Sequence, residues 1–206
     1  MKELWTPSRK LHLPPPTMIG FLLETGAWDA KGKLFHQERI LSRSPLKQLL
    51  QLLLVQFSTA TQDVYDITGV ERAGAIASAQ ILNANAGIAD ALRGCVIGTG
   101  NTPVDITDKK LVTQIAHGSG ATQMIYNAVV FDATVTVSDP DCTFDMWRNF
   151  NNNSGGSITV KETGIYAQFM VGASPYQACL VRDVPAEIVV PDGGGCYVKY
   201  TPKITE

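Results

Sequence analysis

Apolar residues recur at two different spacings along the chain. Between residues 44 and 58, leucines return every three or four positions, which is the spacing of one face of an α-helix. Ser44 is a favourable N-cap residue, and Pro45 suits the first helical position. The pattern therefore predicts one helix near residues 44–58. Because most of its circumference is apolar, we expect this helix to be buried.

From residue 59 onward, short apolar runs are separated by Gly, Asn, Asp and Pro. In residues 131–138, apolar and polar side chains alternate with the period of two that is typical of a β-strand. The candidate strands are residues 64–67, 75–82, 94–98, 111–116, 124–137, 142–150, 158–160, 165–170, 179–183, 186–190 and 196–200. Such strands without intervening helices predict a mainly β chain, folded as an antiparallel, jelly-roll-like β-sandwich.

The first 33 residues have the pattern of an extended arm. Three consecutive prolines favour polyproline II, which has no internal hydrogen bonds. Residues 18–24 are apolar enough to form a strand, residues 28–33 resemble a turn, and residues 34–41 are a candidate hairpin partner. We therefore divide the chain into an arm, residues 1–33, and a β-sandwich domain, residues 34–206, which includes the helix.

Charged residues are sparse and unevenly distributed. They make up 17% of the chain, with a formal net charge of −2, which argues against nucleic-acid binding. Residues 1–47 carry eight basic and four acidic residues, a net of +4, which leaves −6 for residues 48–206. A basic arm and an acidic body predict a homo-oligomer in which the arm of one copy packs on the next. The alternative is a modest surface bias without a partner.

Neither a signal peptide nor a membrane span is expected from the sequence. Trp5 and Pro7 interrupt any apolar signal region, and the most apolar run, residues 46–57, falls short of the ~20 residues that a span needs. We expect a soluble chain that is made in the cytoplasm, without a membrane partner.

The cysteines and the candidate motifs each have a simple structural interpretation. The cysteines contain no CxxC pair, so buried free thiols are expected and a Cys179–Cys196 bridge stays open. Gly98-Thr99-Gly100 lacks the third glycine of a dinucleotide fingerprint, and His117 precedes no nucleophile elbow. We expect no enzymatic activity, no cofactor and no metal. The cysteines are Cys95, Cys142, Cys179 and Cys196.

One cluster of carboxylates keeps calcium binding open as an alternative to a solvated turn. Its members are Asp132, Asp139, Asp141 and Asp145. A separate group, Glu162, Arg182 and Asp183, lies within apolar strand-like runs. A charge there is costly unless it is paired. We therefore predict that Arg182 pairs with Glu162 or Asp183 and stabilises the sandwich.

Three blocks of this sequence resemble segments of tailed-bacteriophage virion proteins. Residues 96–104 are similar to a strand-plus-turn pattern, V-x-G-T-G-x-T-P-V, and residues 150–166 to F-N-N-x-S-G-x-x-I-T-V-x-E-x-G-L-Y. Residues 180–201 resemble a closing hairpin, R-D-V followed by V-P-x-G and V-x-Y-T. The resemblance covers residues 34–204 and leaves the arm out. It implies a structural β-sandwich module, of the kind that occurs in capsid decoration, neck and tail.

The resemblance implies a non-enzymatic virion subunit, which we expect in the tail or neck, assembled in the host cytoplasm through contacts with its own copies and other virion proteins. A capsid-decorating protein and a receptor- or glycan-binding module that uses the Asn/Gly loops stay open as alternatives. A polysaccharide hydrolase would need a carboxylate pair that the sequence does not single out. The expected subunit contacts are Trp5, Arg9, Lys10, Leu11, Leu13, Met18, Phe21 and Trp28.

Overall fold

The computed structural model describes residues 18–42, 46, 48–49, 52, 62–74, 82–134 and 136–205. Within these residues the chain is mainly β, which confirms the predicted fold class at that level. The helix predicted near residues 44–58 lies largely outside the described residues. Four of its positions are described: Leu46, Gln48 and Leu52 are buried, and Leu49 is partly buried.

Sixteen strands are described. They are β1 (Met18–Trp28), β2 (Leu34–Ser42), β3 (Gln62–Tyr65), β4 (Glu71–Gly74), β5 (Gly94–Gly98), β6 (Ala116–His117), β7 (Gln123–Tyr126), β8 (Val130–Phe131), β9 (Thr136–Ser138), β10 (Asp141–Thr143), β11 (Met146–Asn151), β12 (Ile158–Val160), β13 (Glu162–Val171), β14 (Ser174–Asp183), β15 (Ile188–Val190) and β16 (Gly195–Thr205).

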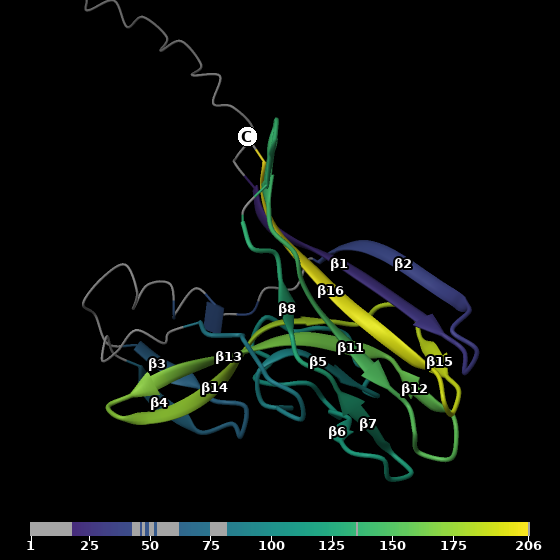
Figure 1. Cartoon of the computed structure of the whole chain (residues 1–206). Helices are drawn as coiled ribbons and strands as arrows, with labels where there is room; N and C mark the ends of the chain where they lie inside the picture. The colour runs from purple at the N-terminus through teal and green to yellow at the C-terminus, as the bar shows by residue number, and fades with distance from the viewer. Residues whose placement is uncertain are drawn as a thin grey trace, which may run out of the picture.

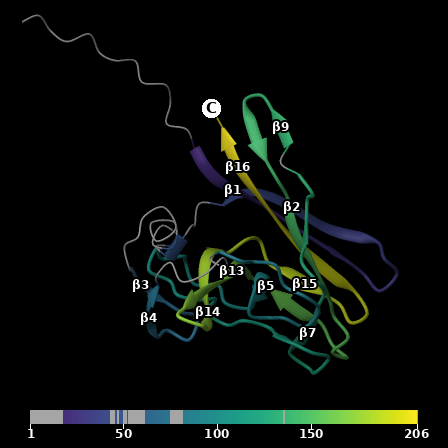
Figure 2. The ribbon, with the colours of Figure 1, turned by 60° about the vertical axis from the view of Figure 1, so that its left-hand side comes forward.

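Nine of these strands form one twisted sheet (Figure 1), and its main order is β2-β1-β16-β11-β7-β6. The predicted hairpin is confirmed, because β1 and β2 pair antiparallel around a turn at residues 29–33. On its other side β1 pairs with β16 along its whole length, from Met18 opposite Thr205 to Trp28 opposite Gly195. The β9–β10 hairpin attaches to the far end of β16 (Figure 2).

Residues 18–28 therefore lie in the interior of a sheet, although the sequence pattern placed them in an extended arm. The partner that holds them there comes from the other end of the chain. Backbone pairing of this kind satisfies the hydrogen-bonding groups of β1 on both edges. The sequence of residues 18–28 alone cannot predict this pairing, because β16 is separated from β1 by more than 160 residues.

A second sheet has the order β14-β13-β5, and two further strand pairs are β12–β15 and β3–β4. The inner faces of both sheets contribute to one hydrophobic core. From β16 the side chains of Cys196, Val198 and Tyr200 are buried, while the alternate residues Tyr197 and Lys199 are partly exposed. β13 is buried on both faces from Glu162 to Phe169, because the segment at residues 99–115 covers its outer side.

Three sequence expectations about strands and hairpins are wrong. Residues 111–115 form no continuous strand: Gln114 makes a single bridge to Gly98, the N–H groups of Leu111 and Thr113 bind side chains of β13, and only residue 116 begins a strand, β6. Residues 124–137 are divided among β7, β8 and β9. The closing hairpin that residues 180–201 resemble is not formed by β15 and β16, since β15 pairs with β12 and β16 pairs with β1, β10 and β11. The candidate strand at 75–82 lies outside the described residues, except for Leu82.

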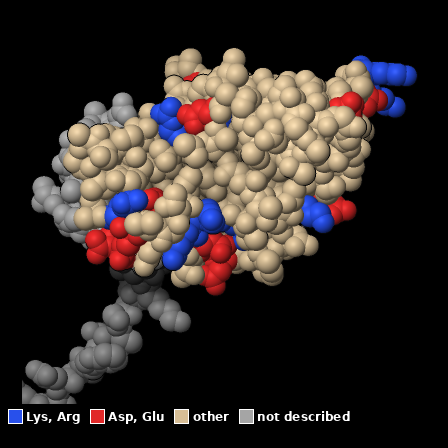
Figure 3. Space-filling view, turned by 90° about the horizontal axis from the view of Figure 1, so that it is seen from below, with Lys and Arg blue, Asp and Glu red and all other residues tan. Residues whose placement is uncertain are grey.

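The low charge content is visible on the molecular surface. On the face in Figure 3, charged side chains occur in a few small groups, in several of which both signs are adjacent, and broad uncharged areas separate them. No helix among the described residues is long and apolar enough to cross a membrane.

Candidate functional site

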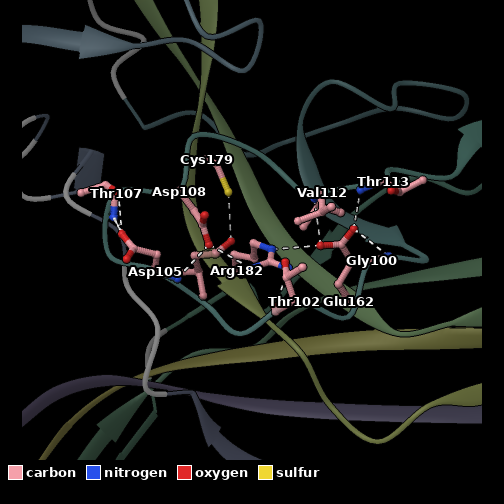
Figure 4. A network of polar contacts seen from close by, with 12 residues as sticks. Gly100, Thr102, Asp105, Thr107, Asp108, Val112, Thr113, Glu162, Cys179 and Arg182 are labelled. Atoms are coloured by element: carbon pink, nitrogen blue, oxygen red, sulfur yellow. Dashed lines mark hydrogen bonds and ion pairs between the residues drawn. The ribbon is translucent and has the colours of Figure 1, made fainter.

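Arg182 on β14 lies at the centre of a buried network (Figure 4). Its Nε donates to Glu162 Oε2 at 2.9 Å, and its Nη1 donates to Asp108 Oδ2, also at 2.9 Å. Its Nη2 donates to the carbonyl oxygen of Thr102 at 3.1 Å. The side chains of Arg182 and Glu162 are both 0% exposed. Burial lowers the pKa of Arg182, but its bonds to the two carboxylates outweigh this effect and raise that pKa overall.

Glu162 on β13 also binds the segment that crosses above it. Its Oε1 accepts hydrogen bonds from the backbone N–H groups of Gly100 and Thr113, and its Oε2 accepts one from Val112. A Cβ atom at position 100 would lie 2.5 Å from Glu162 Oε1. The close contact between Glu162 and the backbone at position 100 therefore explains why this position of the Gly-Thr-Gly motif is a glycine, and no bound nucleotide is needed to explain it. Since both oxygens of Glu162 are bonded within the chain, this network has a structural role.

Asp183, the third charged residue predicted at this place, joins the two sheets. Its Oδ2 accepts hydrogen bonds from Ser42 Oγ at 2.9 Å and from the Tyr200 hydroxyl at 3.1 Å. The Tyr200 hydroxyl also lies 2.8 Å from Thr163 Oγ1 on β13. Burial, with the Asp183 charge adding to it, raises the pKa of Tyr200 well above its ordinary value. These contacts connect β16 with β13 and β14 across the core.

Sequence reasoning missed a second buried arginine, Arg148 on β11. Its guanidinium donates to the carbonyl oxygens of Gly87, Arg93 and Asn127, and lies 4.8 Å from the centre of the Tyr126 ring. The signal was present in the sequence, because strand alternation places residue 148 on the same face as two apolar neighbours. Through its bonds to Gly87 and Arg93, Arg148 holds the loop before β5 in place. Arg148 therefore also has a structural role.

The opposite face of the large sheet carries an open polar pocket of about 260 Å³. It lies where β1, β16 and β11 run side by side (Figure 1). Lys199 Nζ is shared between two carboxylates, 3.5 Å from Glu24 Oε2 and 3.3 Å from Asp145 Oδ2. The pocket is lined by Glu24, Asp132, Asp145, Trp147, Tyr197 and Lys199.

The pocket holds an excess of negative charge. The Tyr197 hydroxyl donates to Glu24 Oε1 at 2.7 Å. Partial burial raises the pKa of Glu24, but this bond and the Lys199 charge outweigh it, so that pKa is lowered overall. The same surroundings, with burial as the largest cause, raise the pKa of Tyr197 to about 12. Arg39 is opposite Glu24 in the register of β2 but does not line the pocket.

The acidic cluster singled out in the sequence is only partly brought together. Asp132 accepts a hydrogen bond from the backbone N–H of Asp145 at 2.8 Å, and both line the pocket. Asp141 instead pairs with Lys203 at 2.7 Å. Among the described residues, no group of His, Cys, Asp or Glu has an arrangement that could hold a metal ion. The structure therefore offers no support for the calcium alternative at this cluster.

The two sheets differ in how their edges are covered. The outer edge of β14 accepts backbone hydrogen bonds from Leu46 to Leu180 and from Ile67 to Gln177. In the described part of the chain, β2 pairs with β1 alone and forms the edge of the large sheet. Leu34 and Phe35 on β2 are each 49% exposed, and Leu41 is 45% exposed. An exposed edge strand with apolar side chains is a template for pairing with another chain.

Most of the predicted subunit-contact residues lie outside the described residues. These are Trp5, Arg9, Lys10, Leu11 and Leu13. The backbone of Met18 is paired within β1. Phe21 packs against the core and meets the Tyr200 ring edge-on at 6.4 Å. Trp28 packs against Gly195, where a Cβ atom would lie 2.5 Å from its ring. The described side chains of Phe21 and Trp28 thus make contacts within their own chain.

All four cysteines are free thiols, and the Cys179–Cys196 bridge that the sequence left open is absent. These two residues lie on strands of different sheets, β14 and β16. Burial raises the pKa of the Cys95 and Cys196 thiols to about 12. Burial raises the pKa of Cys179 as well. Thiols held neutral in this way are poor nucleophiles and poor metal ligands.

Comparisons of the chain with models of protein families, with curated proteins and with solved structures find no match. The resemblance to phage virion proteins therefore rests on the three sequence blocks alone.

Proposed function

We propose that this chain is a non-enzymatic structural subunit of a tailed-phage virion, located in the tail or neck, that assembles with its own copies and with other virion proteins. The observation that carries the proposal is the edge strand β2, which pairs with β1 alone among the described residues and exposes apolar side chains. In this proposal the two sheets form a jelly-roll-like sandwich, and the helix near residues 44–58 completes its buried side.

The sequence blocks that resemble virion proteins coincide with parts of the structure that hold strands and turns in place. Residues 96–104 include the glycine and threonine that bind Glu162 and Arg182. In the second block, the buried Asn152 side chain donates to the carbonyl oxygens of Gly156 and Val190 and so closes the loop after β11. Gly155 in that loop has a φ of +82°, a conformation that favours glycine. These roles support a structural rather than a catalytic interpretation.

The proposed mechanism is the addition of a strand from a neighbouring subunit to β2. Main-chain hydrogen bonds along the nine residues of this strand would give affinity, and the exposed apolar side chains would add buried area. Repetition around a closed ring makes many such contacts act together. The edge of β2 that pairs with no described residue would then be covered in the assembled particle, as the edge of β14 already is within the chain.

Two experiments test this proposal. Purified phage particles from cells that carry the gene should contain the chain, which mass spectrometry detects; particles without it would contradict a place in the virion.

In the second experiment, the double variant Phe35→Lys and Leu41→Lys should prevent assembly of the purified protein, measured by light scattering after gel filtration. Ile88→Lys, at a site that is 72% exposed outside β2, is the control and should assemble normally.

A further inference from the structure

We propose that the polar pocket on the outer face of the large sheet binds the basic side chains of Arg9 and Lys10 from a second copy of this chain. This inference rests on the proposed function, since it names the partner of one surface in the same assembly. It concerns the pocket between β1, β16 and β11, which is separate from the strand edge at β2.

The charges of the pocket favour a cationic ligand. Three carboxylates line it, against the single ammonium group of Lys199. Asp132 is exposed and makes no ion pair with any described residue. The side chains of Lys199 and Asp145 are 26% and 31% exposed, so that an incoming group can reach them. Lys199 neutralises only one of the three negative charges, so a second cation bound in the pocket would reduce the remaining negative charge.

Two aromatic side chains also suit a cation. Trp147 is directly opposite Lys199 in the register of β11 and β16, and Tyr197 lies on the same face one pair further along. Guanidinium and ammonium groups bind to the faces of Trp and Tyr, and arginine does so most often. Carboxylates beside an aromatic face therefore offer a guanidinium both charge-assisted hydrogen bonds and a stacking surface.

The size of the pocket argues for a side chain over a larger ligand. Its volume of about 260 Å³ is below the ~300–1,000 Å³ of pockets that enclose drug-sized molecules. An oligosaccharide would therefore extend far beyond it. The end of one long basic side chain, or of two neighbouring ones, matches it better.

The chain carries such side chains directly before β1. Residues 1–17 contain three basic residues, Lys2, Arg9 and Lys10, and one acidic residue, Glu3. A spacer of seven residues separates Lys10 from Met18, where β1 begins, and an extended conformation would give it the longest reach. Three prolines at residues 14–16 favour such an extended spacer. In the proposal, this spacer carries the basic pair to the pocket of a neighbouring copy.

The test uses the full chain and measures self-association by sedimentation at several concentrations and salt levels. Arg9→Glu with Lys10→Glu should raise the dissociation constant at least tenfold, and adding Asp132→Lys to this variant should restore much of the affinity. Lys31→Glu with Lys33→Glu makes the same change of charge in the exposed turn between β1 and β2, and should leave the constant within about twofold if the effect is local.

Other outcomes would overturn the inference while leaving the proposed function intact. If the Phe35→Lys and Leu41→Lys variant dissociates but the Arg9 and Lys10 variant does not, the pocket has no part in assembly.

Free arginine is the probe for a soluble cation. If it quenches tryptophan fluorescence in the intact chain, and the Asp132→Lys substitution abolishes this without any change in self-association, the occupant is a free cation. A concentration-independent effect of the Arg9 and Lys10 substitutions places the segment in its own pocket. A protein that stays monomeric at all concentrations contradicts the proposed self-assembly itself.

Discussion

Two clusters in this molecule have the same arrangement of charges in opposite surroundings. In one, Arg182 bridges Glu162 and Asp108 beneath a covering loop; in the other, Lys199 bridges Glu24 and Asp145 on an open sheet face. The Arg182 side chain is 0% exposed, and the Lys199 side chain is 26% exposed. The same one-base, two-acid pattern therefore stabilises the fold at one place and remains available for binding at the other.

The choice of base agrees with this difference. A guanidinium presents several donors in a rigid plane, so Arg182 can bond two carboxylates and a carbonyl at once in a buried site. An ammonium group is a compact, strongly hydrated charge on a flexible stem, which suits the partly exposed Lys199. Removing a partner is costly in the first surroundings and cheap in the second, because water can replace a lost partner only at the surface.

The largest effect is expected for Arg182→Met. This change leaves two carboxylates without their buried base, and removing one partner of a buried pair costs about 3–5 kcal/mol. Urea denaturation should show a loss of this size in the free energy of unfolding, with a lower melting temperature. An unchanged melting temperature would show that the buried network does not stabilise the fold.

A much smaller effect is expected for Lys199→Met, which makes the matching change in the exposed cluster. Ion pairs between partly exposed side chains contribute about 1 kcal/mol or less to the free energy of unfolding, and salt screens them. The free energy of unfolding in urea should therefore fall by no more than about 1 kcal/mol. A loss as large as that of Arg182→Met would remove the distinction between the two clusters.

The smallest effect concerns acid stability at Glu24. Its folded-state pKa is lowered, so its contribution to stability is fully present above the unfolded-state value and is lost as pH falls through the folded one. Tyr197 and Lys199 face this carboxylate from β16, with Arg39 opposite on β2. Glu24→Gln should flatten the fall in melting temperature between pH 6 and pH 3. An identical pH profile would show that Glu24 is not coupled to folding.

The sequence was informative wherever the signal is local. Residues 94–98 were predicted as a buried strand and form β5, because an apolar run between turn residues has few alternatives. The need of Arg182 for a carboxylate followed from its apolar neighbours alone. The full partner set did not follow, since Asp108 and Thr102 belong to a loop more than 70 residues earlier in the chain. The polar pocket was indicated only in part: Asp132 and Asp145 belong to the acidic cluster found in the sequence, but Glu24 lies more than 100 residues earlier and nothing local connects it to them.

By itself the sequence determined that the chain is mainly β, that a turn follows residue 28 and that Arg182 requires a partner, because alternation, turn chemistry and the cost of a buried charge act over a few residues. The tertiary structure decided how strands pair. It placed β1 between β2 and β16, brought Glu24 to Lys199 and, among the described strands, put β2 at the edge of the large sheet. Strand register depends on hydrogen bonds between segments far apart in the chain, and no local pattern specifies which segments will meet.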